Sequence, residues 1–535
     1  RLDTVLVTFL SKALLASLVL VMPASGADRT VEEIIVTSTR MPAALRDHAG
    51  NIDALGADEI EAAAHVHIHE LLTRVPGVWI TRASGQESLP AIRSPVLTGP
   101  GSCGAFLTLE DGIPSRPAGF CNVNQLFELP TELAERIEIV RGPGNALYGS
   151  NAVHGTINVL SPVPGPDSGN SAALELGSND FARLQGTLRT GGAAPAVLGA
   201  VLADDGGFRD ASGYRQIKGL FRKALPVNEG DFFVSLSVSD LDQDTAGFII
   251  GEDAYKDESL SRENPNPEAF REANSQRVAL TRMRAYPGYT LDVRPYLRRS
   301  EMTFLQHFLP GQPLEENGHV SAGVLSSARF ENDARAVSVG FDAEVADVYL
   351  RQTQFGPTEG SEFLRETRPE GKHYDYEVLG ITAAAYVQAE TQVSPQLTFN
   401  GGLRAEYTHY DYSNKMLPGN TRDDGTPCDF GGCLYTRPAD RSDDFFNVAP
   451  RIGMAYRLPD LGTLYATVGR GFRAPQMTEL YRLQSGQAVS NLDPETVDSV
   501  EVLDSSGHPA FDSAAIAGAR QMRFRPARRD GERIE

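Results

Sequence analysis

Three histidines alternate in the N-terminal part of the chain, at His65, His67 and His69. Imidazole is a common metal ligand, so such a row is the first chemistry to consider. The neighbouring residues predict a short helix at 67–74, and on a helix the side chains of residues i and i+2 point apart. The three rings therefore do not converge on one ion. We expect them to be exposed to solvent and expect no metal site.

The four cysteines fall into two locally spaced pairs, Cys103 with Cys121 and Cys428 with Cys433. Neither pair has the CxxC spacing or the nearby histidine that indicates zinc. In an exported chain the expected chemistry is two disulfides, and reduced thiols are the alternative. A disulfide between Cys103 and Cys121 would rigidify its loop more than it would stabilise the fold.

No constellation of residues that an enzyme needs is found: the sequence has no nucleophile elbow, no Walker loop and no HExxH motif. We expect neither catalysis nor a cofactor. The formal net charge of -21 and the pI of about 5.0 argue against nucleic acid as a partner. A hydrophobic content of 41% with mean hydropathy -0.25 is too polar for a helical membrane protein. It suits either a transmembrane β-barrel or an acidic soluble protein.

The stretch at 135–160 predicts the elements that organise the N-terminal part. Ile137, Ile139 and Val140 predict a half-buried strand, which Arg141-Gly142-Pro143-Gly144 interrupts. Residues 145–148 have room for one helical turn, which Gly149 ends, and a second strand follows at 156–160. So compact a unit must be covered by something larger.

The sequence IEIVRGPGNALYGSNAVHGTINVLSP in this stretch resembles the plug signature of TonB-dependent outer-membrane receptors. The resemblance assigns the motif to Arg141, Gly142, Pro143, Tyr148, Gly149, Gly155 and Asn158. Pro76-Gly77-Val78, Ile92-Arg93 and residues 107–114 stand where that family has its other plug motifs, in the same order. The resemblance covers residues 32 to about 500 and implies an α+β plug domain inside an antiparallel transmembrane β-barrel. The alternative is a soluble α+β domain whose glycines merely serve turns.

The N-terminal residues predict export. Residues 1–27 have the apolar run and the small-residue cleavage site of a signal peptide. In the following segment, 28–40, residues Glu32, Glu33, Ile34, Ile35, Val36 and Thr37 resemble the TonB box, which binds the periplasmic protein TonB. A short β-branched stretch near a free terminus can add as a strand to a partner's sheet. An ordinary first strand of the plug is the alternative, and no signalling domain is expected before it.

The plug is expected at residues 41–165, with short helices at 57–64 and 67–74. By resemblance, its loops around the cysteine pair face an extracellular ligand. The expected ligand-facing residues are Arg93, Arg116, Phe120, Asn122 and Asn124. Simple solvation of these loops, or contact with the barrel wall, is the alternative.

Residues 170–502 predict a partial transmembrane barrel. Segments of about ten residues alternate with period 2 and are divided by polar turns, as such strands require. Residues Phe232, Val234, Leu236 and Val238 alternate with Phe233, Ser235, Ser237 and Ser239. Short turns alternate with long polar stretches, which indicates periplasmic turns and extracellular loops; a soluble sandwich is the alternative.

A later motif, Phe472-Arg473-Ala474-Pro475, matches the FRAP motif of haem receptors. That family places a histidine and an NPNL-like motif after it, whereas this chain has no histidine between Phe472 and Glu495 and reads NLDP. FRAP is also widespread in receptors for other ligands. Haem therefore stays a minor alternative.

The strand pattern departs from the family near the end of the chain. We count about fourteen candidate strands, whereas plugged transporters close with roughly 22. Alternation stops at residue 502, and the arginine-dense tail at 503–535 resembles out-of-frame translation; a genuine periplasmic tail is the alternative. The chain as written would then be an incomplete barrel.

The resemblance implies ligand-gated active transport across the outer membrane of a Gram-negative bacterium. The expected ligand is a ferric siderophore or a similar metal chelate, and the expected partners are TonB with ExbB–ExbD and outer-membrane lipid. We expect a monomer. The alternatives are an inactive truncated fragment, a surface-binding protein without transport, and haem or cobalamin as ligand.

Overall fold

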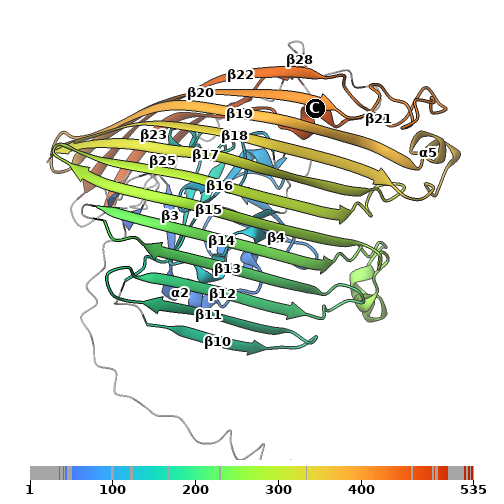
Figure 1. Ribbon diagram of the computed structural model, residues 1–535, viewed down its shortest axis with the longest axis horizontal. Helices are drawn as coiled ribbons and strands as arrows, with labels where there is room; N and C mark the ends of the chain where they lie inside the picture. The colour runs from blue at the N-terminus through green and yellow to red at the C-terminus, as the bar shows by residue number, and fades with distance from the viewer. Residues whose placement is uncertain are drawn as a thin grey trace, which may run out of the picture. The chain divides into compact units, whose positions relative to one another are not determined.

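The computed structural model describes most of the chain from residue 35 onward, and every described residue lies in one compact unit, Ile35–Glu535 (Figure 1). The described residues are 35–36, 40, 43–44, 51–97, 102–120, 125–165, 169–227, 230–332, 334–458, 462–484, 487, 492–503, 523–525, 528–529 and 532–533. The signal peptide expected at 1–27 lies outside them. So do Glu32, Glu33, Ile34, Thr37, Cys121, Asn122 and Asn124.

A five-stranded mixed sheet forms the centre of the plug, in the order β3-β8-β9-β6-β7. Strands β6 and β9 are parallel, and the other pairs are antiparallel. The bounds are β3 Ile52–Gly56, β6 Phe106–Glu110, β7 Ile113–Pro114, β8 Arg136–Arg141 and β9 Gly155–Leu160, with the one-turn helix α4 at Asn145–Tyr148. The strand–turn–strand unit predicted at 135–160 is thereby confirmed.

Short elements pack on this sheet and close the plug core. They are α2 Ala57–Ala63, α3 Ile68–Leu72, the hairpin β4 Val78–Arg82 with β5 Ser88–Ile92, and the 3-10 turns η2 Ser102–Ala105, η3 Gln125–Glu128 and η4 Thr131–Leu133. The two predicted helices are confirmed. Leu71 and Leu72 of α3 are buried with Ile68 in one cluster that includes Ile137 and Ile139 of β8, because residues three and four after Ile68 share its helix face.

The prediction that the alternating histidines are exposed is wrong for His65 and His67, which are 2% and 0% exposed. Both precede α3 rather than lying within it. His65 Nε2 lies 3.1 Å from Thr131 Oγ1, and His67 Nε2 donates to the carbonyl of Glu87 at 3.0 Å. His67 Nδ1 accepts the backbone N–H of His69 and caps the helix. Burial lowers the pKa of His67 to about 4, so both rings serve packing as neutral groups.

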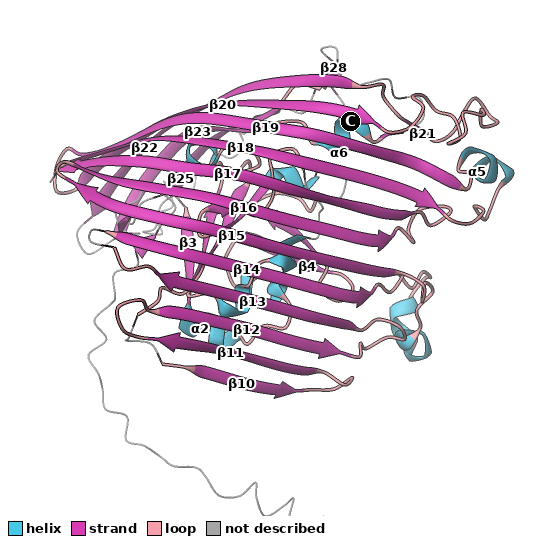
Figure 2. Ribbon diagram, in the orientation of Figure 1, coloured by secondary structure: helices cyan, strands magenta, loops and turns pink. Residues whose placement is uncertain are grey.

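A fifteen-stranded sheet makes up the rest of the unit, and every neighbouring pair in it is antiparallel (Figure 2). Its strands run in chain order from β10 to β26. The bounds are β10 Ser171–Leu176, β11 Ala182–Thr190, β12 Ala196–Asp205, β13 Tyr214–Ala224, β14 Asp231–Asp244, β15 Phe270–Tyr286, β16 Tyr289–Leu305, β17 Leu314–Asn332, β18 Arg335–Gln354, β19 Gly371–Gln392, β20 Leu397–Asn414, β22 Arg441–Leu458, β23 Gly462–Arg473, β25 Glu495–Leu503 and β26 Arg523–Arg525. Fourteen of the strands are longer than β26, in agreement with the predicted count of about fourteen.

The connections differ in length at the two ends of this sheet. Tight turns at one end, such as Tyr286 to Tyr289, oppose long loops at the other, which lie at the right of Figure 1. The long loops carry η5 Ala254–Lys256, η6 Glu258–Arg262, α5 Glu362–Thr367 and α6 Met477–Tyr481, and also β21 Tyr435–Thr436 paired with β24 Leu483–Gln484. The predicted asymmetry of short turns and long loops is confirmed.

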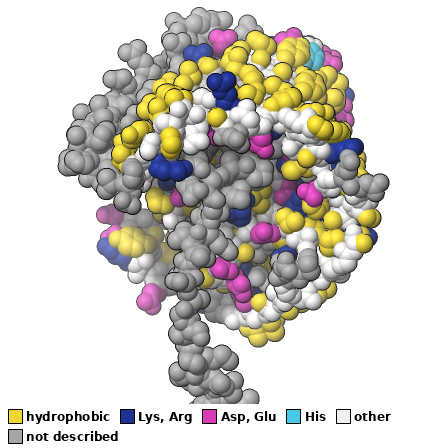
Figure 3. Space-filling view, turned by 90° about the vertical axis from the view of Figure 1, so that its left-hand side faces the viewer, with side chains coloured by type: hydrophobic (Ala, Val, Ile, Leu, Met, Phe, Trp, Pro, Cys, Tyr) yellow, Lys and Arg dark blue, Asp and Glu magenta, His cyan; other side chains and the backbone are white. Residues whose placement is uncertain are grey.

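Side chains alternate between the two faces of the sheet. On β12, Val197 and Val201 are buried, whereas Leu198 and Leu202 are about half exposed. On β14, the predicted serine face is the inner one, and Ser237 Oγ donates to plug residue Glu110 at 2.9 Å. Seen from the short-turn end, hydrophobic side chains gather along the upper arc of the rim (Figure 3). This is the pattern of a sheet with an apolar outer face and a polar lumen that holds the plug.

Other short pairings complete the described structure. Strand β1 Ile35–Val36 pairs with β2 Ala43–Ala44, and β27 Arg528–Arg529 pairs with β28 Glu532–Arg533. The sequence predicted no barrel strand in the tail, whereas β26 pairs with β25. In the described part of the chain no helix is long and apolar enough to cross a membrane.

Candidate functional site

A cavity of about 740 Å³ lies between the plug and the long loops. The β4–β5 hairpin of the plug contributes Arg82, Ser84 and Glu87, and loops and strand ends of the sheet contribute the remainder. Its aromatic lining residues are Phe208, Tyr214, Phe248, Phe270, Phe304, Phe308, Tyr374 and Tyr435. The volume lies within the roughly 300–1,000 Å³ of small-molecule sites, and aromatic walls with a few polar groups are typical of them.

The charged side chains that line this cavity are net positive, although the chain as a whole carries -21. Five arginines face three carboxylates: Arg82, Arg209, Arg271, Arg368 and Arg482 against Asp205, Glu87 and Glu315. Glu87 pairs with Arg271 at 2.9 Å, and Glu315 pairs with Arg482 at 3.0 Å. A positive cavity in an acidic protein attracts an anionic ligand.

Among the described residues, Arg368 lines this cavity without a paired carboxylate. No carboxylate pairs with it within the described part of the chain, where the other ion pairs of the cavity wall are seen. Burial lowers the pKa of its guanidinium, and the neighbouring Arg482 lowers it further. An anionic group bound between these two arginines would offset both effects.

The loop at 415–440, which leads into β21 at the cavity wall, is organised around the buried Arg437. Its guanidinium donates to backbone carbonyls of Leu417 at 2.8 Å, Thr421 at 2.7 Å and His373 at 3.2 Å. The predicted disulfide between Cys428 and Cys433 is present in this loop, with an S–S distance of 1.95 Å. Cys103 is also disulfide-bonded, and its expected partner Cys121 lies outside the described residues.

The residues of the plug signature have two structural roles. The glycines let the backbone pass close to its neighbours, and the polar residues bond separate segments of the plug to one another. Gly142, Gly149 and Gly155 each stand where a side chain would not fit: Gly142 and Gly149 have φ of 98° and 79°, and a Cβ at Gly155 would lie 2.5 Å from a backbone oxygen. Asn158 accepts the N–H of Gly112 at 3.0 Å, and Arg141 pairs with Asp53 and donates to the carbonyl of Pro76. Tyr148 is buried against the barrel wall in a cluster with Tyr386. Pro143 lies in the turn between β8 and α4.

An ionic network joins the plug to the barrel wall. Asp342 of β18 accepts from both Arg40 and Arg404, each at 2.7 Å, and Arg404 also pairs with Glu406 at 2.9 Å. Glu406 then accepts the backbone N–H of Ser150 at 3.1 Å, directly after Gly149. All of these side chains are at most 11% exposed. No local sequence pattern indicates this network, because its members lie on separate segments of the chain.

Arg40 connects this network to the predicted TonB-binding segment. It lies between β1, which contains Ile35 and Val36 of that segment, and β2, which pairs with it. Its guanidinium is 4.8 Å from the ring centroid of Tyr386 and 5.5 Å from that of Tyr148. The short hairpin is therefore attached to both the wall and the plug signature through one side chain.

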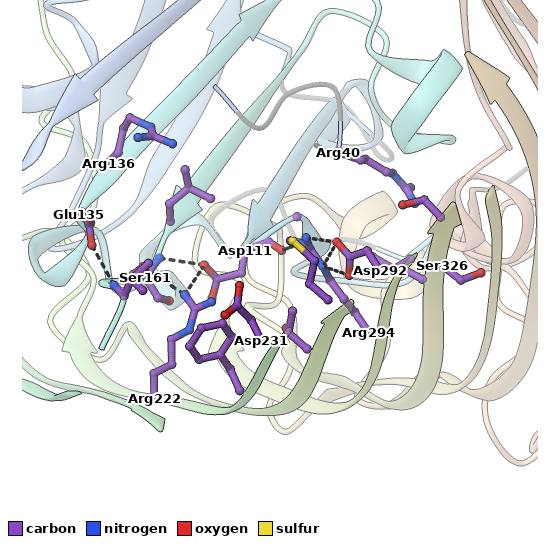
Figure 4. A pocket seen from close by; sticks show the side chains of 18 of the residues that line it. Arg40, Asp111, Glu135, Arg136, Ser161, Arg222, Asp231, Asp292, Arg294 and Ser326 are labelled. Atoms are coloured by element: carbon purple, nitrogen blue, oxygen red, sulfur yellow. Dashed lines mark hydrogen bonds and ion pairs between the residues drawn. The ribbon is translucent and has the colours of Figure 1, made fainter. Parts of the chain in front are cut away.

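A second cavity, of about 380 Å³, lies towards the short-turn end (Figure 4). Asp111 dominates its polar contacts: it accepts the N–H of Ser161 at 2.9 Å and lies 3.6 Å from Arg222. Arg294 donates to the carbonyl of Asp111 at 2.7 Å and is paired with Asp292. The contacts of Asp111 with Arg222 and Arg294 cross between plug and wall, so this cavity is a gap in their interface.

Of the residues predicted to face the ligand, the three that the structure describes, Arg93, Arg116 and Phe120, do not line the larger cavity. Arg116 is buried and donates to the carbonyls of Cys103 and Phe106, the latter at 2.7 Å. Burial lowers its pKa to about 10. Phe120 packs in a buried aromatic cluster with Tyr374 and Tyr410, and Arg93 lies beside Gly77. Asn122 and Asn124 cannot be placed, because they lie outside the described residues.

Two family models match most of this chain. The one described as "TonB dependent receptor-like, beta-barrel" matches residues 199–504, and "TonB-dependent Receptor Plug Domain" matches residues 44–156. The vitamin B12 transporter BtuB of Vibrio vulnificus (strain CMCP6) is 28% identical over 187 residues, which is 35% of this chain and 29% of that protein. The match therefore spans less than a third of this curated relative.

Solved structures share the fold at low identity. The ferric citrate transporter FecA in its unliganded form superposes with a TM-score of 0.68 at 17% identity, over 86% of this chain and 68% of that one. The ferric yersiniabactin uptake receptor FyuA from Yersinia pestis superposes with a TM-score of 0.64 at 16% identity, over 85% and 69%. At these identities the likeness concerns the fold alone.

Proposed function

The chain belongs to the TonB-dependent receptor family, whose members are outer-membrane transporters and not enzymes, and we propose that it imports an anionic metal chelate. The observation that carries the ligand class is the net positive, aromatic-lined cavity beneath the long loops. Long loops of such barrels are extracellular, so this cavity faces the medium from which a scarce nutrient is taken. Ferric siderophores and related chelates are anionic and bear planar groups that suit arginines and aromatic rings.

The plug makes this a gated process rather than passive diffusion. Its five-stranded sheet is joined to the wall by the buried network through Arg40, Asp342, Arg404 and Glu406. Ligand that binds one plug conformation better than another shifts the population toward it. In the proposed cycle this shift makes the segment at 32–37 available to TonB, and ExbB–ExbD supplies the energy that displaces the plug.

Cobalamin is the second candidate ligand. The observation in its favour is the 28% identity to a vitamin B12 transporter. The charge of the cavity favours the metal chelate, because a carboxylate-rich ligand offers several anionic groups to Arg368 and Arg482, whereas cobalamin offers a single phosphodiester.

Energised uptake tests the proposal. Cells that express the receptor are given radiolabelled ferric citrate or cyanocobalamin, and accumulation is compared between the native protein and Ile35→Pro. Proline removes a backbone donor that strand addition needs, so accumulation should fall by at least about tenfold, to the level of cells without TonB. Ile35→Val, which keeps the β-branched side chain, is the matched control. Accumulation that survives Ile35→Pro would exclude coupling through this segment, and uptake of cyanocobalamin alone would replace the chelate by the second candidate.

A further inference from the structure

The connection between β23 and β25 touches both the large cavity and the plug. Thr478 of helix α6 lines the cavity, and so do Arg482 and Gln484, which follow the helix. Residues from the end of the FRAP motif to the start of α6, namely Ala474, Gln476 and Met477, contact the plug. We call the first part of this connection, residues 474–484, the relay segment.

At its first end the relay segment is hydrogen-bonded to two loops of the plug. The backbone N–H of Met477 donates to the carbonyl of Gly119 at 2.7 Å. Gln476 Nε2 donates to Asn151 Oδ1 at 3.2 Å, and the N–H of Ala474 donates to Ser150 Oγ at 3.3 Å. Ser150 and Asn151 directly follow the signature glycine, and Ser150 is also bonded to Glu406 of the wall. The contact therefore reaches the turn that fixes the plug to the barrel.

At its other end the relay segment is bound within the cavity wall. Arg482 pairs with Glu315 of β17 at 3.0 Å and donates to Gln306 at 3.2 Å. The next carbonyl, of Leu483, accepts the hydroxyl of Tyr374 at 2.5 Å. An anionic ligand group that reaches Arg482 competes with Glu315 for the same guanidinium.

The part between these two ends is stiff. Glu479 receives two hydrogen bonds from Arg473, at 2.8 and 2.9 Å, and also accepts the N–H of Gln476 at 2.8 Å. Tyr481 stacks on Tyr412 at 4.2 Å and donates to Asp443 at 2.8 Å. Because a short helix held in this way moves as a body, a displacement of one end is passed to the other.

We infer that the relay segment couples occupancy of the cavity to the plug, with Arg482 as the sensing residue and Gln476 as the positioning residue for Asn151. Engagement of Arg482 weakens its contacts with Glu315 and Gln306, shifts α6, and loosens the turn at 149–151 through Gln476. The inference rests on the proposed function in taking the cavity as the ligand site. It adds a route through a barrel loop rather than through the plug hairpin that lines the cavity.

Hydrogen exchange in the receptor without ligand tests the coupling directly. Arg482→Ala releases the cavity end, so the plug peptide at 145–152 should exchange about fivefold to tenfold faster, while the core peptide at 52–56 is unchanged. Arg209→Ala is the matched control: Arg209 lines the same cavity, but its guanidinium is bonded to the carbonyl of Glu263 and not to the relay segment. It should leave the plug peptide unchanged. Glu315→Gln breaks the same contact from β17, should reproduce the increase, and decides the result if Arg482→Ala does not fold.

A double-mutant cycle separates coupling from a merely structural role. Gln476→Ala alone should also accelerate exchange at 145–152. Adding Arg482→Ala to it should cause no further increase, because the contact of the relay segment with Asn151 is already lost. Arg482→Lys should restore part of the native protection. Plug exchange that is unchanged in both Arg482→Ala and Glu315→Gln, or effects of Arg482→Ala and Gln476→Ala that multiply, would overturn the inference. The measurement needs no transport, so its failure and the failure of the uptake proposal are distinguishable.

Discussion

The guanidinium of Arg40 donates one hydrogen bond to each carboxylate oxygen of Asp342, both at 2.7 Å. This forked geometry is the strongest that an arginine and a carboxylate form. It links the hairpin of β1 and β2 to strand β18, far along the sequence. In the proposed transport cycle, release of the segment at 32–37 therefore requires that this pair be broken or bypassed.

Arg40→Ala should expose β1 without any ligand. Removing one partner of a buried ion pair costs about 3–5 kcal/mol, less here because Arg404 still neutralises Asp342. A cysteine introduced at Val36 should then react with a periplasmic maleimide at least about tenfold faster than in the parent. Arg215→Ala, which removes an exposed arginine on β13, is the control. An unchanged labelling rate would mean that Arg40 does not hold the hairpin.

Gly149→Ala should destabilise the plug. A left-handed backbone costs a non-glycine residue about 1–2 kcal/mol, and the added Cβ would also clash with Glu406 and Arg404. The single tryptophan of this sequence, Trp79 on β4, lies in the plug and reports its unfolding by fluorescence in guanidinium. The guanidinium concentration at the midpoint of unfolding should be clearly lower in Gly149→Ala than in the native protein. At Gly165 a Cβ meets nothing within 4 Å, so Gly165→Ala should leave the midpoint unchanged; an equal fall in both variants would refute the argument from contact.

Glu128 should make plug stability decrease as pH rises. Burial raises its pKa to about 7, against the ordinary 4.5, and the bonds from Ser300 and Gln125 only partly compensate. Since the folded state binds this proton more tightly, the stabilisation is complete below pH 4.5 and is lost as pH rises through 7. The loss is of order 3 kcal/mol.

The comparison of native protein with Glu128→Gln isolates this effect. The buried His65 and His67 titrate in the opposite sense, but equally in both proteins. When unfolding is followed by the fluorescence of Trp79, the free energy of unfolding of the variant should rise relative to that of the native protein between pH 5 and pH 8. A constant difference across that range would show that Glu128 does not titrate there.

Arg437 should matter more to the loop at 415–440 than the disulfide does. Arg437→Met leaves several buried carbonyls without their donor, at about 1–3 kcal/mol each. Cys428 and Cys433 are only five residues apart, so their bond constrains a short loop and contributes about 2 kcal/mol. Trypsin added to intact cells should cleave at Lys415 or Arg422 faster in Arg437→Met than in the Cys428→Ser, Cys433→Ser double variant. Faster cleavage in the double cysteine variant than in Arg437→Met would show that the disulfide stabilises this loop more than Arg437 does.

Arg368→Gln should weaken binding of an anionic chelate selectively. A charge-assisted hydrogen bond contributes about 1.5–3 kcal/mol, so affinity for ferric citrate should fall by tenfold or more, while binding of cyanocobalamin, which carries one phosphodiester, should fall less. Equilibrium binding to purified receptor measures both, with Arg215→Gln as an exposed control. Equal losses for the two ligands would indicate a general distortion of the cavity rather than a lost anion contact.

The sequence determined the strands and the plug signature because both depend on local physics. Alternation of Leu198 and Leu202 with Val197 and Val201 needs only a sheet with unlike faces, and β12 follows it residue by residue. The turn at Gly149 follows from the conformational freedom of glycine. In both cases the responsible residues are neighbours in sequence.

The ionic network and the cavity could not be predicted in the same way. Arg40 and Asp342 meet only because eight strands fix the register of β18, and no charge pattern near either residue indicates the other. The lining of the cavity comes from loops that alternation does not describe. The burial of His65 and His67 could not be predicted either, because their partners, Thr131 and the carbonyl of Glu87, lie far away in the sequence.

Plug and wall each have glycine where the other presents a bulky side chain. Gly119 of the plug lies against the hydroxyl of Tyr410, Gly149 against Glu406, and Gly199 of the wall against Leu133. Such reciprocity makes the two parts complementary in shape: replacing only one of them with a counterpart that lacks these glycines would bring a side chain into an occupied place. Chimeric receptors made by exchanging plugs should therefore fold only when each of these glycines still faces the bulky side chain that it faces here.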